Sequence, residues 1–212
     1  MFSSLEVNAT FYALPQKSTI EKWAQQVPEQ FRFTFKVPKT ITHAKDLQFS
    51  FEELERFIET VSYAGQKKGC LLVQLPPKVS RDKEEEFTGM LECLSENADG
   101  WNIAVEFRHP SWYTAAVYRM LQGYGIGMVE HDRPPAKTPK MNPWLDFVYL
   151  RFHGPGERYN GSYEDAVLES YTQRIANFIR EGKEVYAYFN NTLGDAYRNL
   201  QTLNSMVSNI IK

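Results

Sequence analysis

The chain has 212 residues, enough for a sizeable hydrophobic core, and we expect one domain over residues 1–212. Its formal net charge is -2, which excludes a global positive field for nucleic acid or anionic membranes but leaves room for a local basic patch. There is no apolar run of membrane-spanning length and no N-terminal targeting pattern, so the sequence predicts a cytoplasmic protein without a membrane partner. The two cysteines, Cys70 and Cys93, lack metal or redox spacing and are expected to be buried free thiols.

Seven short apolar runs end in polar residues. They cover residues 5–10, 33–36, 71–74, 105–109, 128–132, 149–153 and 186–190. Strands that are apolar along their length and polar at their carboxyl ends are typical of a parallel barrel, whose active site lies at that end. The pattern therefore predicts a barrel with a polar mouth.

Segments with helical periodicity lie between these runs. Ser18 with Glu21, Ser50 with Glu53 and Ser162 with Asp165 have capping-box-like spacing and predict three helix starts. Ser111 is expected to cap a fourth helix, and two more are expected over residues 84–96 and from about residue 195. The regular alternation of strand and helix indicates βαβ units and a parallel sheet.

One connection differs from the others. Residues 133–143 contain four prolines and no periodicity, which predicts a long loop in place of a helix. In a barrel this loop would lie on the face that carries the active site.

The alternation of residue types along the strands predicts which side chains face the barrel lumen. In a barrel, residues of one parity point inward and those of the other pack against the helices. Apolar residues such as Leu5, Val7, Phe33, Phe35 and Val105 share the outward parity. The inward parity holds polar residues, among them Glu6, Asn8, Thr10, Tyr12, Lys36, Gln74, Glu106, Arg108, Arg151, His153 and Asn190.

The predicted lumen contains many charges. A buried unpaired charge costs several kcal/mol, so these groups must pair with one another or with a ligand. One interpretation is a self-contained network in which Lys36, Arg108 and Arg151 neutralise the carboxylates. The other is a ligand site, which the concentration of polar groups at strand carboxyl ends favours.

The residues named so far also carry a family resemblance. The matching motifs are residues 6–12, 31–36 with Thr42-His43, 72–77, 105–109 with Trp112, 149–154, and 188–191 followed by Ala196 and Asn199. In this order and over nearly the whole chain, they resemble the domain of unknown function 72 family, also called YecE-like proteins. The resemblance implies a TIM-like α/β barrel but no known reaction.

The chain departs from the family pattern at its start. Family members usually open with a Gly-rich strand that carries a Gly-Trp pair, followed by a helix. Here residues 1–6 lead directly into what resembles the second strand. We therefore expect an N-terminally shortened barrel that lacks the first βα unit and has seven parallel strands. The edges of the first and last strands would then be exposed unless they close on each other or a partner covers them, and a homodimer is one such partner.

The first chemical interpretation is an anion site, above all for phosphate. Lys36, Arg108 and Arg151 could converge as donors, and two glycine-containing segments, 154–156 and 160–162, precede a helix N-terminus. Tyr12, Trp112, Tyr159 and Tyr163 could supply stacking faces for a base or sugar.

A second interpretation is a metal-dependent hydrolase. Glu6, Glu106, Asp132 and His153 offer ligand atoms from separate strands. The interleaved arginine and lysine residues oppose a divalent cation, so we expect no cofactor and keep a divalent metal as an alternative.

The third interpretation is metal-free acid/base chemistry with Glu106 and His153 as catalytic candidates. Asn8, Gln74, Asn190 and Asn191 would orient the ligand, and His109 would lie at the rim of the barrel mouth.

We therefore expect a protein that binds an anionic or phosphorylated small molecule, or a nucleic-acid fragment, at the barrel mouth and hydrolyses it. A non-catalytic nucleotide or nucleic-acid binding protein is the alternative, so the sequence leaves open whether the protein is an enzyme. The complete set of expected ligand-binding residues is Glu6, Asn8, Thr10, Tyr12, Lys36, Gln74, Arg108, His109, Trp112, Asp132, Arg151, Tyr159, Tyr163, Asn190 and Asn191.

Overall fold

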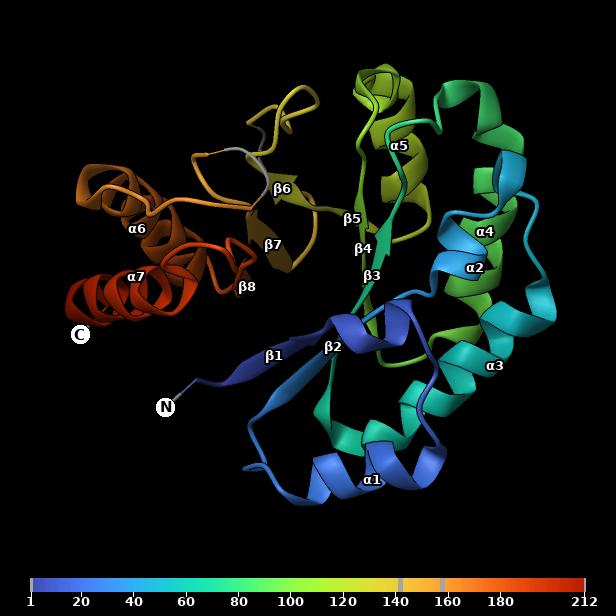
Figure 1. Ribbon diagram of the computed structural model, residues 1–212, viewed down its shortest axis with the longest axis horizontal. Helices are drawn as coiled ribbons and strands as arrows, with labels where there is room; N and C mark the ends of the chain where they lie inside the picture. The colour runs from blue at the N-terminus through green and yellow to red at the C-terminus, as the bar shows by residue number, and fades with distance from the viewer. Residues whose placement is uncertain (1, 141–142, 157–158, 212) are drawn as a thin grey trace. The chain divides into compact units, whose positions relative to one another are not determined.

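The computed structural model describes residues 2–140, 143–156 and 159–211. The chain forms two compact units, residues 1–128 and residues 129–212, and each has its own parallel sheet and helices (Figure 1). Within the described ranges, the helices are too short or too polar to cross a membrane.

The sheet of the first unit has the strand order β1-β2-β3-β4-β5, and all neighbouring strands are parallel. The strands are β1 (Ser4–Val7), β2 (Arg32–Lys36), β3 (Lys68–Gln74), β4 (Asn102–Glu106) and β5 (Gly127–Met128). Apolar residues fill β3 without alternation, from Cys70 to Val73, as expected for a parallel strand that is covered on both faces. In the register between β3 and β4, Gln74 pairs with Glu106, so both strands end in a polar residue at the same carboxyl-terminal end of the sheet.

The helices of the first unit follow the strands in sequence. They are α1 (Lys17–Gln25), α2 (Lys39–Thr42), α3 (Phe51–Val61), α4 (Glu84–Asn97) and α5 (Ala115–Gly123), with short 3-10 helices at η1 (Asn8–Phe11), η2 (Lys45–Leu47), η3 (Ser62–Lys67), η4 (Arg81–Lys83) and η5 (Pro110–Trp112). Helices α2 to α5 lie to one side of strands β3 to β5 (Figure 1). Fully buried Phe35, Phe57, Phe87 and Phe107 belong to the core of this unit.

The second unit has a three-stranded parallel sheet in the order β6-β7-β8. Its strands are β6 (Glu130–His131), β7 (Phe147–Phe152) and β8 (Glu184–Phe189), and its helices are α6 (Asp165–Arg180) and α7 (Ala196–Ile210). Alternate residues of β7, namely Val148, Leu150 and Phe152, pack against Leu168 of α6 and Leu203 of α7. The two helices lie side by side in Figure 1.

The predicted helices are present, but only some of their predicted starts are right. Ser50 caps α3, because its hydroxyl accepts from the backbone NH of Glu53 at 3.1 Å. The other three predicted starts, at Ser18, Ser111 and Ser162, are wrong. Helix α1 begins earlier, after Gln16; α5 is capped by Thr114, whose hydroxyl accepts from the NH of Val117; and α6 begins after Glu164.

The prediction of parallel strands alternating with helices is confirmed, whereas the expected strand count is not. The run at residues 128–132 forms two strands of two residues each, β5 and β6, which belong to different sheets. Residues 5–10 do not form one strand either, because β1 ends at Val7 and η1 begins at Asn8. The closed barrel stays a prediction.

Parity along the strands predicts burial well inside the sheet and poorly at its edge. Phe33, Phe35 and Val105 are buried as expected, but the side chain of Leu5 is 51% exposed. Because β1 is the edge strand of its sheet, Leu5 lines an open apolar groove with Val7, Trp23, Val27 and Phe33. The homodimer expected to cover such an edge stays a prediction.

The proline-containing connection lacks a helix over residues 133–140, as predicted, and residues 141–142 lie outside the described residues. Thr138 attaches this loop to β6. Its NH donates to the carbonyl oxygen of His131 at 3.1 Å, and its hydroxyl donates to that of Val129 at 3.0 Å. Cys70 and Cys93 are both buried and have free thiols, as the sequence predicts.

Candidate functional site

Four predicted site residues meet at the carboxyl ends of β2, β3 and β4 in the first unit. They are Lys36, Gln74, Glu106 and Arg108. The Lys36 ammonium donates to Oε1 of Gln74 at 3.0 Å. Lys36 is 9% exposed and Arg108 is 7% exposed, so the sheet holds two cationic groups largely out of water at one end.

Glu106 and Arg108 form an ion pair, and the Glu106 side chain is fully buried. Charge-assisted contacts between a guanidinium and a carboxylate are among the stronger polar contacts in proteins. Removing either partner would leave a buried charge without its counterion, which is costly. The pair is therefore a rigid part of the site wall.

Helix η1 positions an aromatic ring against Lys36. The hydroxyl of Thr10 donates to the carbonyl oxygen of Lys36 at 2.7 Å, which fixes η1 to the end of β2. As a result, the ring centroid of Phe11 lies 4.0 Å from the Lys36 ammonium, a cation–π contact. Thr10, which the sequence predicted to bind ligand, is fully buried and has a structural role instead.

His43 follows α2 and lies beside the same ring. Its imidazole contacts Phe11 edge to face at 5.0 Å, and Nδ1 lies 2.9 Å from the hydroxyl of Thr42. Burial, and then the positive charges of Lys36 and Lys78, lower the pKa of His43 from 6.5 to about 4. His43 is therefore neutral at neutral pH and senses a positive potential at this end of the sheet.

The residues predicted from the first strand lie on β1 and η1. The Asn8 side-chain amide donates to Oε1 of Glu6 at 3.0 Å, so Asn8 orients that carboxylate. Tyr12 is 72% exposed, contacts Phe11 edge to face at 5.1 Å, and has the Lys39 ammonium 5.7 Å from its ring centroid.

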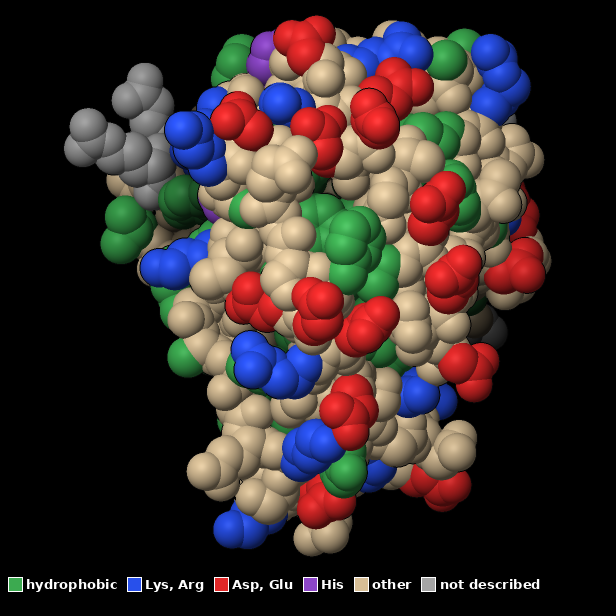
Figure 2. Space-filling view, turned by 90° about the vertical axis from the view of Figure 1, so that its right-hand side faces the viewer, with side chains coloured by type: hydrophobic (Ala, Val, Ile, Leu, Met, Phe, Trp, Pro, Cys, Tyr) green, Lys and Arg blue, Asp and Glu red, His purple; other side chains and the backbone are tan. Residues whose placement is uncertain are grey.

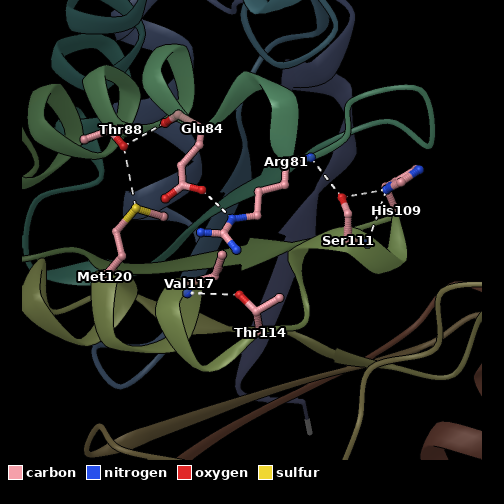
Figure 3. A network of polar contacts seen from close by, with 8 residues as sticks. All are labelled: Arg81, Glu84, Thr88, His109, Ser111, Thr114, Val117 and Met120. Atoms are coloured by element: carbon pink, nitrogen blue, oxygen red, sulfur yellow. Dashed lines mark hydrogen bonds and ion pairs between the residues drawn. The ribbon is translucent and has the colours of Figure 1, made fainter.

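The segment after β4 is held by a small polar network (Figure 3). Nδ1 of His109 lies 2.7 Å from the hydroxyl of Ser111 and accepts the Ser111 NH at 3.3 Å, and that hydroxyl accepts the backbone NH of Arg81 at 2.8 Å. Trp112 is fully buried, stacks on Phe107, and donates its indole NH to the carbonyl oxygen of Val79 at 2.9 Å. His109 thus orders a loop, and Trp112 belongs to the core rather than to a stacking face for ligand.

A second polar cluster lies in the second unit, around Asp132. One oxygen of its carboxylate accepts the backbone NH of His153 at 2.9 Å, and the other accepts the hydroxyl of Tyr163. That hydroxyl in turn accepts the NH of Gly154 at 2.6 Å. Burial and the Asp132 carboxylate raise the pKa of Tyr163 well above its usual value, so the phenol is a permanent donor.

Aromatic and cationic side chains extend this second cluster. The Tyr159 ring contacts His153 edge to face at 5.5 Å and has the Arg133 guanidinium 4.2 Å from its centroid. His153 also contacts His131, with ring centroids 5.9 Å apart. Arg151 is buried at the carboxyl end of β7, and Asn190 follows β8, where its backbone NH donates to the carbonyl oxygen of Phe152 at 2.7 Å.

Asn191 is fully buried and connects two loops of the second unit. Its amide donates to the carbonyl oxygen of Gly161 at 2.9 Å and to Oδ1 of Asn199 at 3.0 Å. Asn199 in turn donates to the hydroxyl of Ser162 at 3.0 Å. A methyl group at Gly194 would lie 2.2 Å from the carbonyl oxygen of Gly161, so the two loops touch backbone to backbone. Asn191 is thus a structural anchor rather than a ligand-facing amide.

The predicted site residues belong to both units. Lys36, Gln74, Glu106 and Arg108 meet in the first unit, while Asp132, His153, Tyr159 and Tyr163 meet in the second. The proposed catalytic residues, Glu106 and His153, belong to different units. The carboxylates predicted as metal ligands have protein partners: Asn8 for Glu6, Arg108 for Glu106, and Tyr163 for Asp132.

Sequence reasoning did not select Phe11 and His43 as site residues. Strict alternation with the inward residues Thr10 and Tyr12 would turn Phe11 away from the lumen; the turn into η1 instead directs its ring to Lys36. His43 lies outside the predicted strands, and neither strand periodicity nor spacing shows that it lies beside the ring that contacts Lys36. The Thr42-His43 pair in the family motifs was the one available signal.

Comparison with known proteins identifies a family and several relatives of this chain. The model of the family described as "Protein of unknown function DUF72" matches residues 1–211. The UPF0759 protein YecE of Escherichia coli K12 is 30% identical over 144 residues, which cover 66% of this chain and 52% of that protein. The UPF0759 protein YunF of Bacillus subtilis is 23% identical over 91% of this chain and 78% of its own length. The chain thus spans about half the length of the YecE relatives it matches.

Solved structures show the same fold. A DUF72 family protein of Thermotoga maritima has a TM-score of 0.77 and 30% identity, covering 98% of this chain and 85% of that one. A DUF72 family protein of Enterococcus faecalis has a TM-score of 0.80 and 21% identity, over 97% and 85% of the two chains. A methyltransferase from Methanosarcina mazei is a more distant match in fold alone, with a TM-score of 0.60 and 10% identity over 92% of this chain and 64% of that one.

Proposed function

The chain belongs to the DUF72 family of proteins of unknown function, and we propose that it binds an anionic small molecule at the carboxyl ends of β2, β3 and β4. Lys36 and Arg108 provide the positive charge, and Gln74 orients the Lys36 ammonium. A phosphate or carboxylate group on the ligand is the chemistry that two such cations recognise.

The observation that carries this proposal is that Lys36 and Arg108 are both buried at the carboxyl-terminal end of one parallel sheet. Desolvating a cation is unfavourable unless a partner compensates; Glu106 pairs with Arg108, whereas Gln74, which accepts from Lys36, is a neutral amide. Ligands of α/β proteins bind at this end of the strands, where loops can surround them.

The electrostatics of the neighbouring residues support the same site. Burial is the main cause of the lowered pKa of His43, and the charges of Lys36 and Lys78 lower it further, which supports a positive potential where an anion would enter. On the side of the first unit that helices α2 to α5 cover, acidic side chains gather, interspersed with basic ones (Figure 2). Helix α4, for example, begins with the three glutamates Glu84, Glu85 and Glu86. Their negative charges would repel an anion, so an anion is not expected to dock on that side.

Hydrolysis of the bound molecule remains our proposal for the reaction, with Glu106 and His153 as acid/base candidates. The ion pair with Arg108 holds the Glu106 carboxylate in place. The contacts of His153 with Asp132 and Tyr159 fix its backbone and ring in the second unit.

Titration with inorganic phosphate, followed by calorimetry and by amide chemical shifts, tests the anion site. Lys36→Met should reduce affinity at least about 10-fold, because one charge-assisted contact contributes roughly 1.5–3 kcal/mol. Lys22→Met, at an exposed position on α1, is the matched control and should bind as the wild type does. Equal phosphate affinity for the wild type and Lys36→Met would refute the site.

The reaction has a separate test. Hydrolysis of a generic phosphodiester such as bis(p-nitrophenyl) phosphate is measured with the wild type, Glu106→Gln and His153→Gln. Loss of turnover in both variants is the expected result, and phosphate binding should be retained in His153→Gln, which leaves the Glu106–Arg108 ion pair in place. Absence of turnover in the wild type, with phosphate bound, would favour the non-catalytic binding protein.

A further inference from the structure

Aromatic side chains accumulate beside the proposed anion site, and they come from a segment outside the strands. Phe11 and Tyr12 belong to η1 and its last turn, and His43 follows α2. Phe11 is central to this group, since it contacts Tyr12 at 5.1 Å and His43 at 5.0 Å, both edge to face. The Lys36 ammonium lies over the face of the same ring at 4.0 Å.

Tyr12 is the one member of this group that presents most of its ring to solvent, with 72% of the residue exposed. Single exposed aromatics are ordinary on protein surfaces. This one lies one residue from the ring that contacts Lys36, and Lys39 lies over it at 5.7 Å. A flat, exposed π-face is thus positioned next to cationic groups.

His43 adds a neutral polar group to the same rim. The lowered pKa, about 4, keeps its imidazole uncharged at neutral pH, so it can hydrogen-bond without adding a third cation. The first unit therefore brings three groups together around Phe11: the Lys36 cation, which can bind an anion, the Tyr12 ring, which can stack, and the uncharged His43 imidazole, which can hydrogen-bond.

We infer that the ligand of this site combines its anionic group with a planar heteroaromatic ring, as a nucleoside phosphate does. The phosphate binds at Lys36, and the base stacks on Tyr12. Both side chains contact the same Phe11 ring, which keeps the two subsites within the length of one nucleotide. The inference rests on the anion site proposed above and adds the chemical class of its ligand.

Two probes separate the two subsites in calorimetric titrations: adenosine 5′-monophosphate and ribose 5-phosphate. The nucleotide should bind about 10-fold more tightly than ribose 5-phosphate, because stacking on one aromatic side chain contributes roughly that factor. Tyr12→Ala should remove this difference and leave the affinity for ribose 5-phosphate unchanged, whereas Tyr12→Phe should retain it. Tyr197→Ala is the matched control, since Tyr197 is exposed to a similar degree, 66%, in the second unit.

Each outcome bears on a different part of the inference. Equal affinity of the wild type for the nucleotide and ribose 5-phosphate would overturn the aromatic subsite and leave the anion site intact. A tighter nucleotide complex that is unaffected by Tyr12→Ala would overturn the assignment to Tyr12. If neither phosphate compound bound, the anion site itself would fail, and this inference with it.

Discussion

The hydroxyl of Thr10 donates to the backbone carbonyl oxygen of Lys36 across 2.7 Å and so links the helix that carries Phe11 to the strand that carries Lys36. The two residues are 26 positions apart in sequence. The cation–π contact at the site therefore depends on a buried hydroxyl that touches neither the ring nor the ammonium.

Thr10→Val should weaken phosphate binding, because it removes the donor and leaves the shape of the side chain nearly unchanged. The buried carbonyl of Lys36 then loses a partner, at a cost of about 1–2 kcal/mol in the free energy of unfolding. Thr10→Ser keeps the hydroxyl and should bind phosphate as the wild type does. Phosphate titration and urea unfolding of both variants measure the effect, and equal behaviour of Val and Ser at this position would contradict it.

The pKa of His43 predicts a pH-dependent loss of stability. The folded pKa of about 4 is lower than the unfolded value of 6.5, so between these values the unfolded chain binds more protons than the folded protein. Stability contributed by neutral His43 is thus complete above pH 6.5, falls as the pH drops towards 4, and changes no further below it. Allowing for solvent screening of this half-buried ring, the loss is about 1–2 kcal/mol.

Urea unfolding of the wild type and His43→Gln at pH 7 and pH 4.5 isolates this contribution, because all other titrating groups are common to both proteins. The wild type should lose more stability than the variant over this interval.

Bound phosphate should also raise the pKa of His43, since it offsets the charges of Lys36 and Lys78. NMR titration of the imidazole with and without phosphate detects that shift, and an unchanged pKa would place the anion elsewhere.

Tyr163→Phe should destabilise the second unit, because the phenol both donates to Asp132 and accepts the NH of Gly154. Removing it leaves two polar groups without that partner and should cost about 2–3 kcal/mol. Tyr171→Phe is a suitable control, since Tyr171 packs on the same Phe152 ring that Tyr163 contacts. Thermal and urea unfolding measure the difference, and equal losses for the two variants would show that the hydrogen bonds of Tyr163 contribute little.

Gly194→Ala should be among the more disruptive single-methyl changes in this chain. The new Cβ would meet three backbone atoms of Gly161 at 2.2 to 2.8 Å, and backbone atoms cannot rotate away. We expect a loss of roughly 2–3 kcal/mol, as for overpacking of a tight core. Gly123→Ala meets nothing within 4 Å and lies at the end of α5, so it should be neutral or slightly stabilising. A near-neutral Gly194→Ala would mean that the two loops can separate without cost.

Much of the fold is predictable from the sequence, because strand parity and helical period are written in the local order of apolar and polar residues. The runs around Phe35, Val73 and Val105 are strands, and the Ser50 cap is where the capping box predicts it. Ser18 and Ser162 have the same spacing to an acidic residue and do not cap. In the second case the hydroxyl of Ser162 accepts a bond from Asn199, a contact 37 residues away that spacing along the chain does not contain.

The site is predictable only where strands position it directly. Lys36, Gln74, Glu106 and Arg108 follow from parity and from the parallel register. Thr10 and Trp112 have the residue types of ligand groups, but their burial and backbone partners depend on how η1 and η5 pack. Phe11 and His43 meet through turns, and turn geometry after a strand was the missing information.

The short first strand has a consequence for ligand exchange. Among the residues that the structure describes, β1 has four residues and pairs with β2 alone in its sheet, so β1 and η1 are expected to open locally far more often than β3 or β4. Each such opening removes Phe11 from Lys36 without unfolding the rest of the unit. Ligand release and fraying of this edge should then share one timescale, and the amide protons of residues 8–12 should exchange more slowly once the site is filled.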